Sequence, residues 1–224
     1  MAKNGGYRDK VVSYEQAAKL IKSGYVVSTA LALGAWSKRM VHAILNRYKE
    51  LENVTLMDGL QLDPAIKLYD EEFLKEAKGR ISFCPTFGTG IIRKLHEKTI
   101  IDHYVNQSSD AGEKLGRTSD VFITEVTPPN WQGFVNLGLT NFYSMDTIRV
   151  AKALGRKMLV IGEVNDQQPV VYGENWMHIS EFDCFVENSH PIHVFKREEP
   201  GEIELIIGNH VLEQFSVGSK TNPS

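Results

Sequence analysis

The sequence predicts an α/β fold with a mainly parallel open sheet and flanking helices. Short, apolar, β-branched runs alternate with segments of helical periodicity along most of the chain. The clearest unit has buried-strand patterns at 121–126 and 158–164, with a helical pattern from about 143 to 154 between them. Such a β–α–β unit requires parallel strands, and right-handed crossovers then bring the loops that follow the strands to one edge of the sheet.

The other elements follow the same alternation. Residues 1 to about 9 are polar and glycine-rich, and we expect a loose tail or a tag remnant there. A capping-box pattern at Ser13 and Gln16 begins the first helix, Gly24 ends it, and Ser37 is expected to cap the second. The remaining expected elements are strands at 25–29, 54–57, 81–84, 102–105 and 182–186, helices at 37–48, 71–78, 91–97 and 110–115, and an apolar segment at 203–215.

Length and composition are those of an ordinary globular protein. The chain has 224 residues, of which 42% are hydrophobic and 24% charged, and its net charge is -3. That length allows one large α/β domain or two small ones. We expect one domain from about residue 10 to 200, with 201–224 as a connector or docking segment and a frayed tail.

Several classes of function find no support in the composition. No cluster of Lys and Arg indicates nucleic-acid binding, and no stretch approaches the roughly 20 apolar residues of a membrane span. The first six residues lack the apolar core of a signal peptide. Cys84 and Cys184 are expected to be free, buried thiols, as suits a reducing cytoplasm.

The loops after strands 121–126 and 158–164 form the default ligand site, because ligands of open α/β sheets bind beside the carboxyl ends of the strands. In the first loop, Pro128 and Pro129 each fix a φ angle and remove an amide donor. Glycines there permit close backbone approach, and asparagines offer amide groups; these residues are Asn130, Gly133, Asn136, Gly138 and Asn141. A long ordered loop is often functional, and the alternative is a structural loop with nothing bound.

Glu125 and Glu163 each lie one residue before the end of a strand. A partly buried glutamate there, with a raised pKa, is suited to act as a base or nucleophile. The interpretation we favour is a carboxylate that pairs with a neighbouring basic residue or points to the rim. His178 is likewise interpreted as a structural histidine, and no metal is expected, since His190 and His193 are separated by a proline and lack further ligands.

Two spaced runs carry a family resemblance. The first continues from Asp120 through Thr127-Pro-Pro-Asn130 to Gly133-Phe-Val-Asn-Leu-Gly138; the second contains Val164-Asn165, Pro169, Gly173 and His178-Ile-Ser180. With Gly34 and the strand entry at 51–54, they resemble the amino-terminal half of the acetyl-CoA hydrolase/transferase family, over about residues 12 to 195. That family includes 4-hydroxybutyrate and butyrate–acetate CoA-transferases. Four positions depart from the family pattern, where serine, aspartate, serine and glutamine are usual: Thr127, Asn130, Asn136 and Glu163.

The resemblance implies the CoA-transferase type of α/β half-domain and a protein that moves CoA between an acyl-CoA and a small carboxylic acid. Coenzyme A thioester is then a substrate, with no permanently bound cofactor. The family's nucleophilic glutamate and glycine-rich CoA-binding segment lie in the carboxyl-terminal half. This chain is therefore expected to be inactive alone, to need a second half or subunit, and to self-associate through the uncovered edge. The substrate-binding residues implied are Gly34, Pro128, Pro129, Asn130, Gly133, Asn136, Gly138, Asn141, Asn165, Gly173 and His178.

Two other functions stay open. One is a non-catalytic acyl-CoA-binding or assembly module, which the substitutions at Asn130 and Asn136 suit. The other is a self-sufficient acyl-CoA hydrolase in which Glu125 or Glu163 is the catalytic residue.

Overall fold

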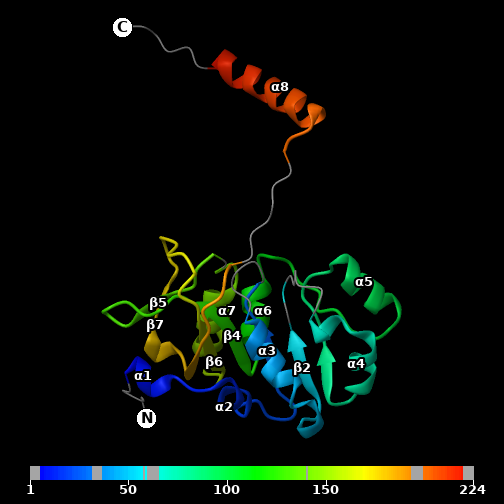
Figure 1. The fold of residues 1–224 in the computed structure, drawn as a ribbon, viewed down its shortest axis with the longest axis vertical. Helices are drawn as coiled ribbons and strands as arrows, with labels where there is room; N and C mark the ends of the chain where they lie inside the picture. The colour runs from blue at the N-terminus through cyan, green and yellow to red at the C-terminus, as the bar shows by residue number, and fades with distance from the viewer. Residues whose placement is uncertain are drawn as a thin grey trace. The chain divides into compact units, whose positions relative to one another are not determined.

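The computed structural model describes residues 6–31, 37–57, 59, 66–139, 141–192 and 199–218. The chain forms two compact units, residues 1–192 and 193–224, which are treated separately below. The first unit is an α/β domain with a parallel sheet, so the predicted fold class is confirmed (Figure 1).

The strands of the main sheet are β1 (Val26–Thr29), β2 (Val54–Met57), β3 (Ile81–Phe83), β4 (Val121–Val126), β6 (Leu159–Val164) and β8 (Cys184–Glu187). A separate ribbon contains β5 (Phe134–Asn136) and β7 (Trp176–His178). The helices are α1 (Tyr7–Lys10), α2 (Tyr14–Ala18), α3 (Lys38–Leu45), α4 (Glu71–Glu76), α5 (Gly90–Glu97), α6 (Ala111–Thr118), α7 (Ser144–Ala153) and α8 (Glu202–Gly218). Three single-turn 3₁₀ helices are η1 (Tyr48–Glu50), η2 (Lys67–Tyr69) and η3 (Ile179–Glu181).

The order of the strands places a reversal in the middle of the sheet. The order is β3-β2-β1-β4-β6-β8, and every neighbouring pair is parallel. The chain first builds outward from β1 to β3, then returns to β4 and builds outward on the other side. Crevices for ligands form where the direction of building reverses, which here is between β1 and β4.

Helices cover both faces of the sheet, so its central strands are continuously apolar. On one face Ile123 and Ile161 pack with α2 and α3, and on the other Phe122 and Val160 pack with α6 and α7. All six residues of β4 are buried. Parallel strands that are buried on both faces have unbroken hydrophobic sequences. For this reason the sequence predicts the strands at 121–126 and 158–164 well.

The long loop after β4 contains regular structure that the sequence analysis does not predict. β5 pairs antiparallel with β7, with Val135 opposite Met177. Each of these strands has only three residues, and their partners are about forty positions apart. Neither strand is long enough to show a clear alternation of its own.

Two expectations about other segments are wrong. Residues 7–10 are not part of a loose tail, because the Tyr7 ring packs at a tilt against Phe185 and its hydroxyl donates to Glu187, while Lys10 is buried. Residues 102–105 do not form a strand. The backbone there is held at Tyr104, whose amide donates to the carbonyl of Pro85, and β3 remains the edge of the sheet.

The second unit contains α8, a helix of 17 residues, where the sequence shows the apolar segment 203–215. In the described part of the chain, no helix is long and apolar enough to cross a bilayer.

Candidate functional site

The candidate site lies at the carboxyl edge of the sheet, around the reversal between β1 and β4. Sequence analysis selects the loops after β4 and β6, and the strand order adds the exit of β1 to them. Tyr143, buried at the start of α7, donates from its hydroxyl to the carbonyl of Thr29 at the end of β1. Gly34 lies outside the described residues.

Asn136 ties the loop after β4 to the loop after β6. Its Oδ1 accepts from the amides of Gly138 (3.0 Å) and Val171 (3.1 Å) and from Nδ2 of Asn175 (3.0 Å). Its Nδ2 donates to the carbonyl of Val171 at 2.9 Å. The side chain is fully buried, so the structure places this predicted substrate contact as the link that holds the two loops together.

Asn130 and Asn141 shape the loop after β4 from its two ends. Oδ1 of Asn130 accepts from the amides of Gln132 (3.0 Å) and Phe134 (2.9 Å), which closes the turn that leads into β5. Oδ1 of Asn141 accepts from the amide of Met145 in the first turn of α7, and its Nδ2 donates to the carbonyl of Glu174. Asn130 is exposed and Asn141 is half-buried, so Asn130 is the most open of the three loop asparagines to a ligand.

Three glycines of the predicted set adopt positive φ angles: Gly133 (80°), Gly138 (65°) and Gly173 (103°). A Cβ on Gly138 would collide with the side-chain amide of Gln168, and one on Gly133 would lie 2.9 Å from Nε2 of His178. Gly173 has open space around it. Close packing therefore requires glycine at the first two, and backbone conformation alone favours it at the third.

Glu125 and Glu163 lie side by side near the carboxyl ends of β4 and β6. They are opposite one another in the pairing of β4 with β6, and both are fully buried. Alternation along the strands puts both on the face covered by α2 and α3. They are not exposed at the rim. Among the described residues, side-chain amides donate hydrogen bonds to both, and the basic neighbour of Glu125 is His190 rather than a lysine or arginine.

Oε1 of Glu125 is surrounded by side chains from the following loops. Nδ2 of Asn165 donates to it at 2.5 Å and Nε2 of Gln168 at 3.0 Å, while Nε2 of His190 lies 3.3 Å away. Oε2 is buried without a hydrogen-bond partner among the described residues. The pKa of Glu125 is raised to about 7, chiefly by burial and also by the adjacent carboxyl of Glu163, while the amide donors and His190 lower it.

The surroundings of Glu163 are similar. Its Oε1 accepts from Nδ2 of Asn188 at 2.8 Å, and its Oε2 has no partner within the described ranges. Burial raises the pKa of Glu163. The hydroxyls of Tyr14 and Ser37 lie beside it without hydrogen bonds of regular geometry. Ser37 lies at the N-cap position of α3, as the sequence predicts, but its side chain makes no capping hydrogen bond.

His178 lies on β7, away from the glutamates. Its Nδ1 lies 2.8 Å from Oγ of Ser180 and accepts from the Ser180 amide, and its ring contacts Phe134 edge-on. Together with Met145 and Ile148 of α7, it lines a hollow between the β5–β7 ribbon and that helix. The local hydrogen bonds agree with its interpretation as a structural histidine.

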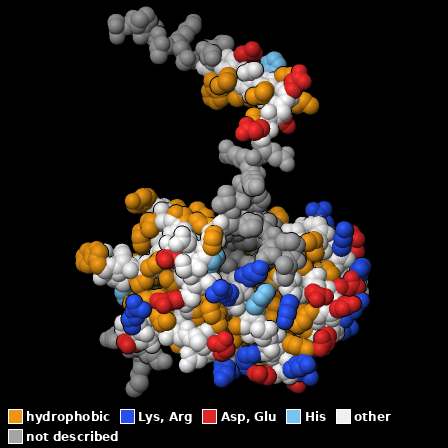
Figure 2. All heavy atoms as spheres, in the orientation of Figure 1, with side chains coloured by type: hydrophobic (Ala, Val, Ile, Leu, Met, Phe, Trp, Pro, Cys, Tyr) orange, Lys and Arg blue, Asp and Glu red, His pale blue; other side chains and the backbone are white. Residues whose placement is uncertain are grey.

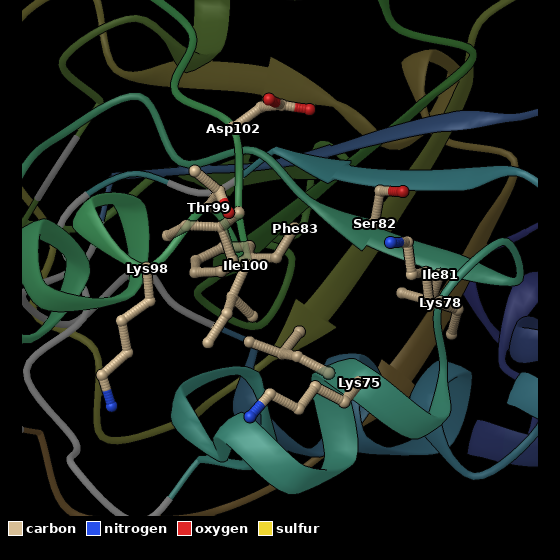
Figure 3. A pocket seen from close by; sticks show the side chains of 11 residues that line it. Lys75, Lys78, Ile81, Ser82, Phe83, Lys98, Thr99, Ile100 and Asp102 are labelled. Atoms are coloured by element: carbon tan, nitrogen blue, oxygen red, sulfur yellow. The ribbon is translucent and has the colours of Figure 1, made fainter.

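A second hollow lies at the far edge of the sheet, beside β3 (Figure 3). Its lining includes Lys75, Lys78 and Lys98. Two of these lysines bind Glu71, with Nζ of Lys75 at 2.7 Å and Nζ of Lys98 at 2.6 Å, and they hold the pKa of that carboxyl at about 2. Glu71 therefore compensates part of the lysine charge, and the hollow lies beside an edge strand, away from the reversal between β1 and β4. It is a weaker candidate than the loops after β1, β4 and β6.

These features define a doubly wound α/β protein whose carboxyl-edge loops are held in place by buried asparagine and glutamate side chains. The family model of the acetyl-CoA hydrolase/transferase N-terminal domain matches residues 1–195. The chain belongs to that family, which confirms the resemblance inferred from the two loop motifs.

The chain spans about half the length of the curated CoA transferases that it matches. The succinyl-CoA:cyclohexane-1-carboxylate CoA transferase of Geobacter metallireducens is 27% identical over 215 residues, 95% of this chain and 46% of that protein. The 4-hydroxybutyrate coenzyme A transferase of Clostridium kluyveri is 26% identical over 217 residues, 95% of this chain and 48% of that protein. The crystal structure of RipA from Yersinia pestis shares the fold, with a TM-score of 0.73 and 24% identity, over 88% of this chain and 46% of its own.

Proposed function

We propose that this chain is the amino-terminal half, or an α-type subunit, of a CoA-transferase that moves CoA between an acyl-CoA and a carboxylic acid. One observation carries the proposal: the match to CoA transferases runs along 95% of this chain but along less than half of those proteins. A second half, in the same polypeptide or in a separate chain, supplies the catalytic glutamate.

The burial of Glu125 and Glu163 supports the assignment of the catalytic glutamate to the second half. A nucleophilic carboxylate must reach the thioester carbon, and the carboxylates of Glu125 and Glu163 have no exposed surface. Amide donors from three loop residues hold them instead: Asn165, Gln168 and Asn188. We assign both glutamates to the support of the loops rather than to bond making.

The proposed reaction is a ping-pong transfer. The glutamate of the second half attacks the acyl-CoA carbonyl, which releases CoA thiolate and leaves a mixed anhydride. The thiolate then attacks the glutamyl carbonyl, so that the first carboxylic acid leaves and a glutamyl-CoA thioester remains. The second carboxylic acid accepts CoA by the same steps in reverse.

This half contributes the loops that face the substrate. The exposed residues Pro128, Asn130 and Gly173 are its proposed contacts with acyl-CoA, and backbone amides of the loops are proposed to stabilise the tetrahedral oxyanion. Asn136, Gly138 and Asn165 are buried and hold the loops in position. The coenzyme A thioester is a substrate in this scheme, and no resident cofactor takes part.

The test is a CoA-transfer assay with acetyl-CoA and butyrate. It compares the chain alone with the chain joined to the remaining half of the Clostridium kluyveri enzyme. We expect no transfer by the chain alone and transfer by the joined protein, which is lost when the glutamate of the second half is changed to glutamine. Thioester cleavage by the chain alone that Glu125→Gln or Glu163→Gln removes would instead establish a hydrolase. Tight acyl-CoA binding by a folded but inactive joined protein would establish a non-catalytic binding module.

A further inference from the structure

α8 presents apolar side chains to solvent over most of its length. The exposed fractions are 70% for Ile203, 58% for Ile207, 49% for Val211 and 74% for Phe215. Figure 2 shows the hydrophobic side chains gathered on this helix. These four residues recur every fourth position, so they form one ridge along the helix. An apolar ridge of this length is typical of a helix that packs against another protein surface.

Leu205 and Leu212 form a second, shorter apolar strip on another side of the helix, since Leu205 is only two positions from Ile203 and Ile207. They are seven positions apart, so they lie on the same side of the helix, and they are 56% and 62% exposed. Asn209 and Glu213 follow Leu205 at intervals of four, so they lie beside this strip and away from the ridge of Ile203 to Phe215. We name the four residues of the ridge the α8 face: Ile203, Ile207, Val211 and Phe215.

The charges of α8 argue against the α8 helix of a second copy of this chain as the occupant. The helix carries Glu202, Glu204 and Glu213 and has no lysine or arginine. Two such helices packed together would bring like charges close, with no cation in either helix to compensate them. A partner that binds the α8 face is therefore expected to have an apolar groove with basic residues at its rim.

The relatives indicate which protein carries that groove. The family model ends at residue 195, but 95% of this chain aligns with the CoA transferases, so the alignment must run well into α8. Those proteins continue for about as many residues again. The segment that forms α8 is therefore shared with relatives in which a second half follows it.

We propose that α8 is a docking helix, whose α8 face packs into an apolar, basic-rimmed groove of the second CoA-transferase half. The proposal rests on the proposed function, because it takes the second half of that enzyme as the occupant. To that function it adds the surface through which this chain binds the second half.

The experiment uses the full chain and, as a separate polypeptide, the part of the Clostridium kluyveri enzyme beyond its matched region. Calorimetry and native mass measure their association, and hydrogen exchange measures the protection of residues 202–218. The test variant is Ile207→Gln with Val211→Gln. Glutamine favours the helix, so the variant removes the apolar centre of the α8 face without disfavouring the helix. The matched control is Asn209→Gln on the other side of the helix.

We expect the α8 amides to exchange freely in the monomeric chain and to become protected in the complex. The double variant should weaken association by a factor of about 10 or more, and the control by less than about twofold. Four results would overturn the proposal: protection of α8 in the monomer, a dimer of this chain that the double variant abolishes, a complex in which α8 stays unprotected, or no complex. CoA transfer is measured in parallel, so that a complex with a protected α8 but no transfer counts against the proposed function alone.

Discussion

Glu125 and Glu163 lie side by side on neighbouring parallel strands, β4 and β6, and neither carboxyl has any surface in contact with solvent. Each has one oxygen that accepts hydrogen bonds from side-chain amides and one oxygen with no partner in the described part of the chain. Two carboxylates this close, in surroundings this dry, cannot both be ionised at low cost. The pair therefore retains at least one proton near neutral pH, and it holds the loops of the candidate site through amide groups.

The first prediction concerns the pH dependence of stability. The pKa of Glu125 in the folded chain is about 7, above its ordinary value of 4.5. The folded state therefore binds this proton more tightly than the unfolded state does. The resulting stabilisation is complete below the ordinary pKa and is lost as the pH rises through about 7. Glu125→Gln keeps an oxygen for Asn165 and removes the titration, so we expect its unfolding free energy to vary less between about pH 5 and about pH 8.

The size of that difference is on the order of 3 kcal/mol, and urea unfolding at a series of pH values measures it. Glu113→Gln is the control, because Glu113 is an exposed residue of α6 that pairs with Arg117. The control should change the stability by less than about 0.5 kcal/mol, with the same pH profile as the parent. Parallel pH profiles for the parent and Glu125→Gln would show that Glu125 does not titrate in this range.

The second prediction concerns the link between the loops. Asn136→Ala removes four hydrogen bonds and leaves the amide and carbonyl of Val171 without their partner. We expect a loss of about 2–4 kcal/mol, because buried polar groups that lose their partners are expensive. Residues 167–175 should also become sensitive to protease. Asn130→Ala is the matched control, since Asn130 is exposed and its side chain accepts from the amides of its own turn, and it should lose about 1 kcal/mol or less. Equal losses for the two variants would contradict the assigned role of Asn136.

The third prediction separates close packing from backbone conformation. Gly138 and Gly173 both have positive φ, but only Gly138 has a neighbour in the way of a Cβ, which is Gln168. Gly173→Ala should therefore cost about 1–2 kcal/mol from backbone strain alone. Gly138→Ala should cost about 1–3 kcal/mol more, because Gln168 must move and its bond to Glu125 is disturbed. Thermal unfolding measures both, and similar melting temperatures would show that Gln168 yields without cost.

The fourth prediction concerns the first helix. Nζ of Lys10 donates to the carbonyls of Ile179 (2.9 Å) and Phe182 (2.6 Å). Lys10→Met keeps an apolar stem but leaves both carbonyls without this donor, so a loss of about 2–3 kcal/mol is expected. Arg8→Met is the control, since the Arg8 side chain is 84% exposed and its pairing with Glu187 is long, and it should change the stability by less than about 0.5 kcal/mol. A null effect of Lys10→Met in urea unfolding would mean that α1 does not stabilise the domain.

Much of the fold is predictable because the strands of a covered parallel sheet are apolar along their whole length. The pattern at 121–126 coincides with β4, and the helical pattern around Ile148 coincides with α7. The family resemblance also comes from local sequence, because the two loop motifs need particular residues at particular spacings. Asn136 and Gly138 are identified in this way before any contact between the loops is known.

Other features depend on contacts between distant parts of the chain. The pairing of β5 with β7, the packing of Tyr7 on Phe185 and the irregular backbone at 102–105 have no local signal. The sequence indicates Glu125 and Glu163 as candidates by their positions near the strand ends. It does not show that they adjoin each other or that both are buried.

The sequence by itself determined the α/β class, most of the elements and the family, because periodicity, turn residues and motif spacing are local properties. Only the tertiary structure decided the strand order, the reversal between β1 and β4, and the role of Asn136 as a link between loops. It also decided the state of Glu125, because a carboxyl responds to its solvent exposure and its neighbours, and these are set by which strands and loops the fold brings together.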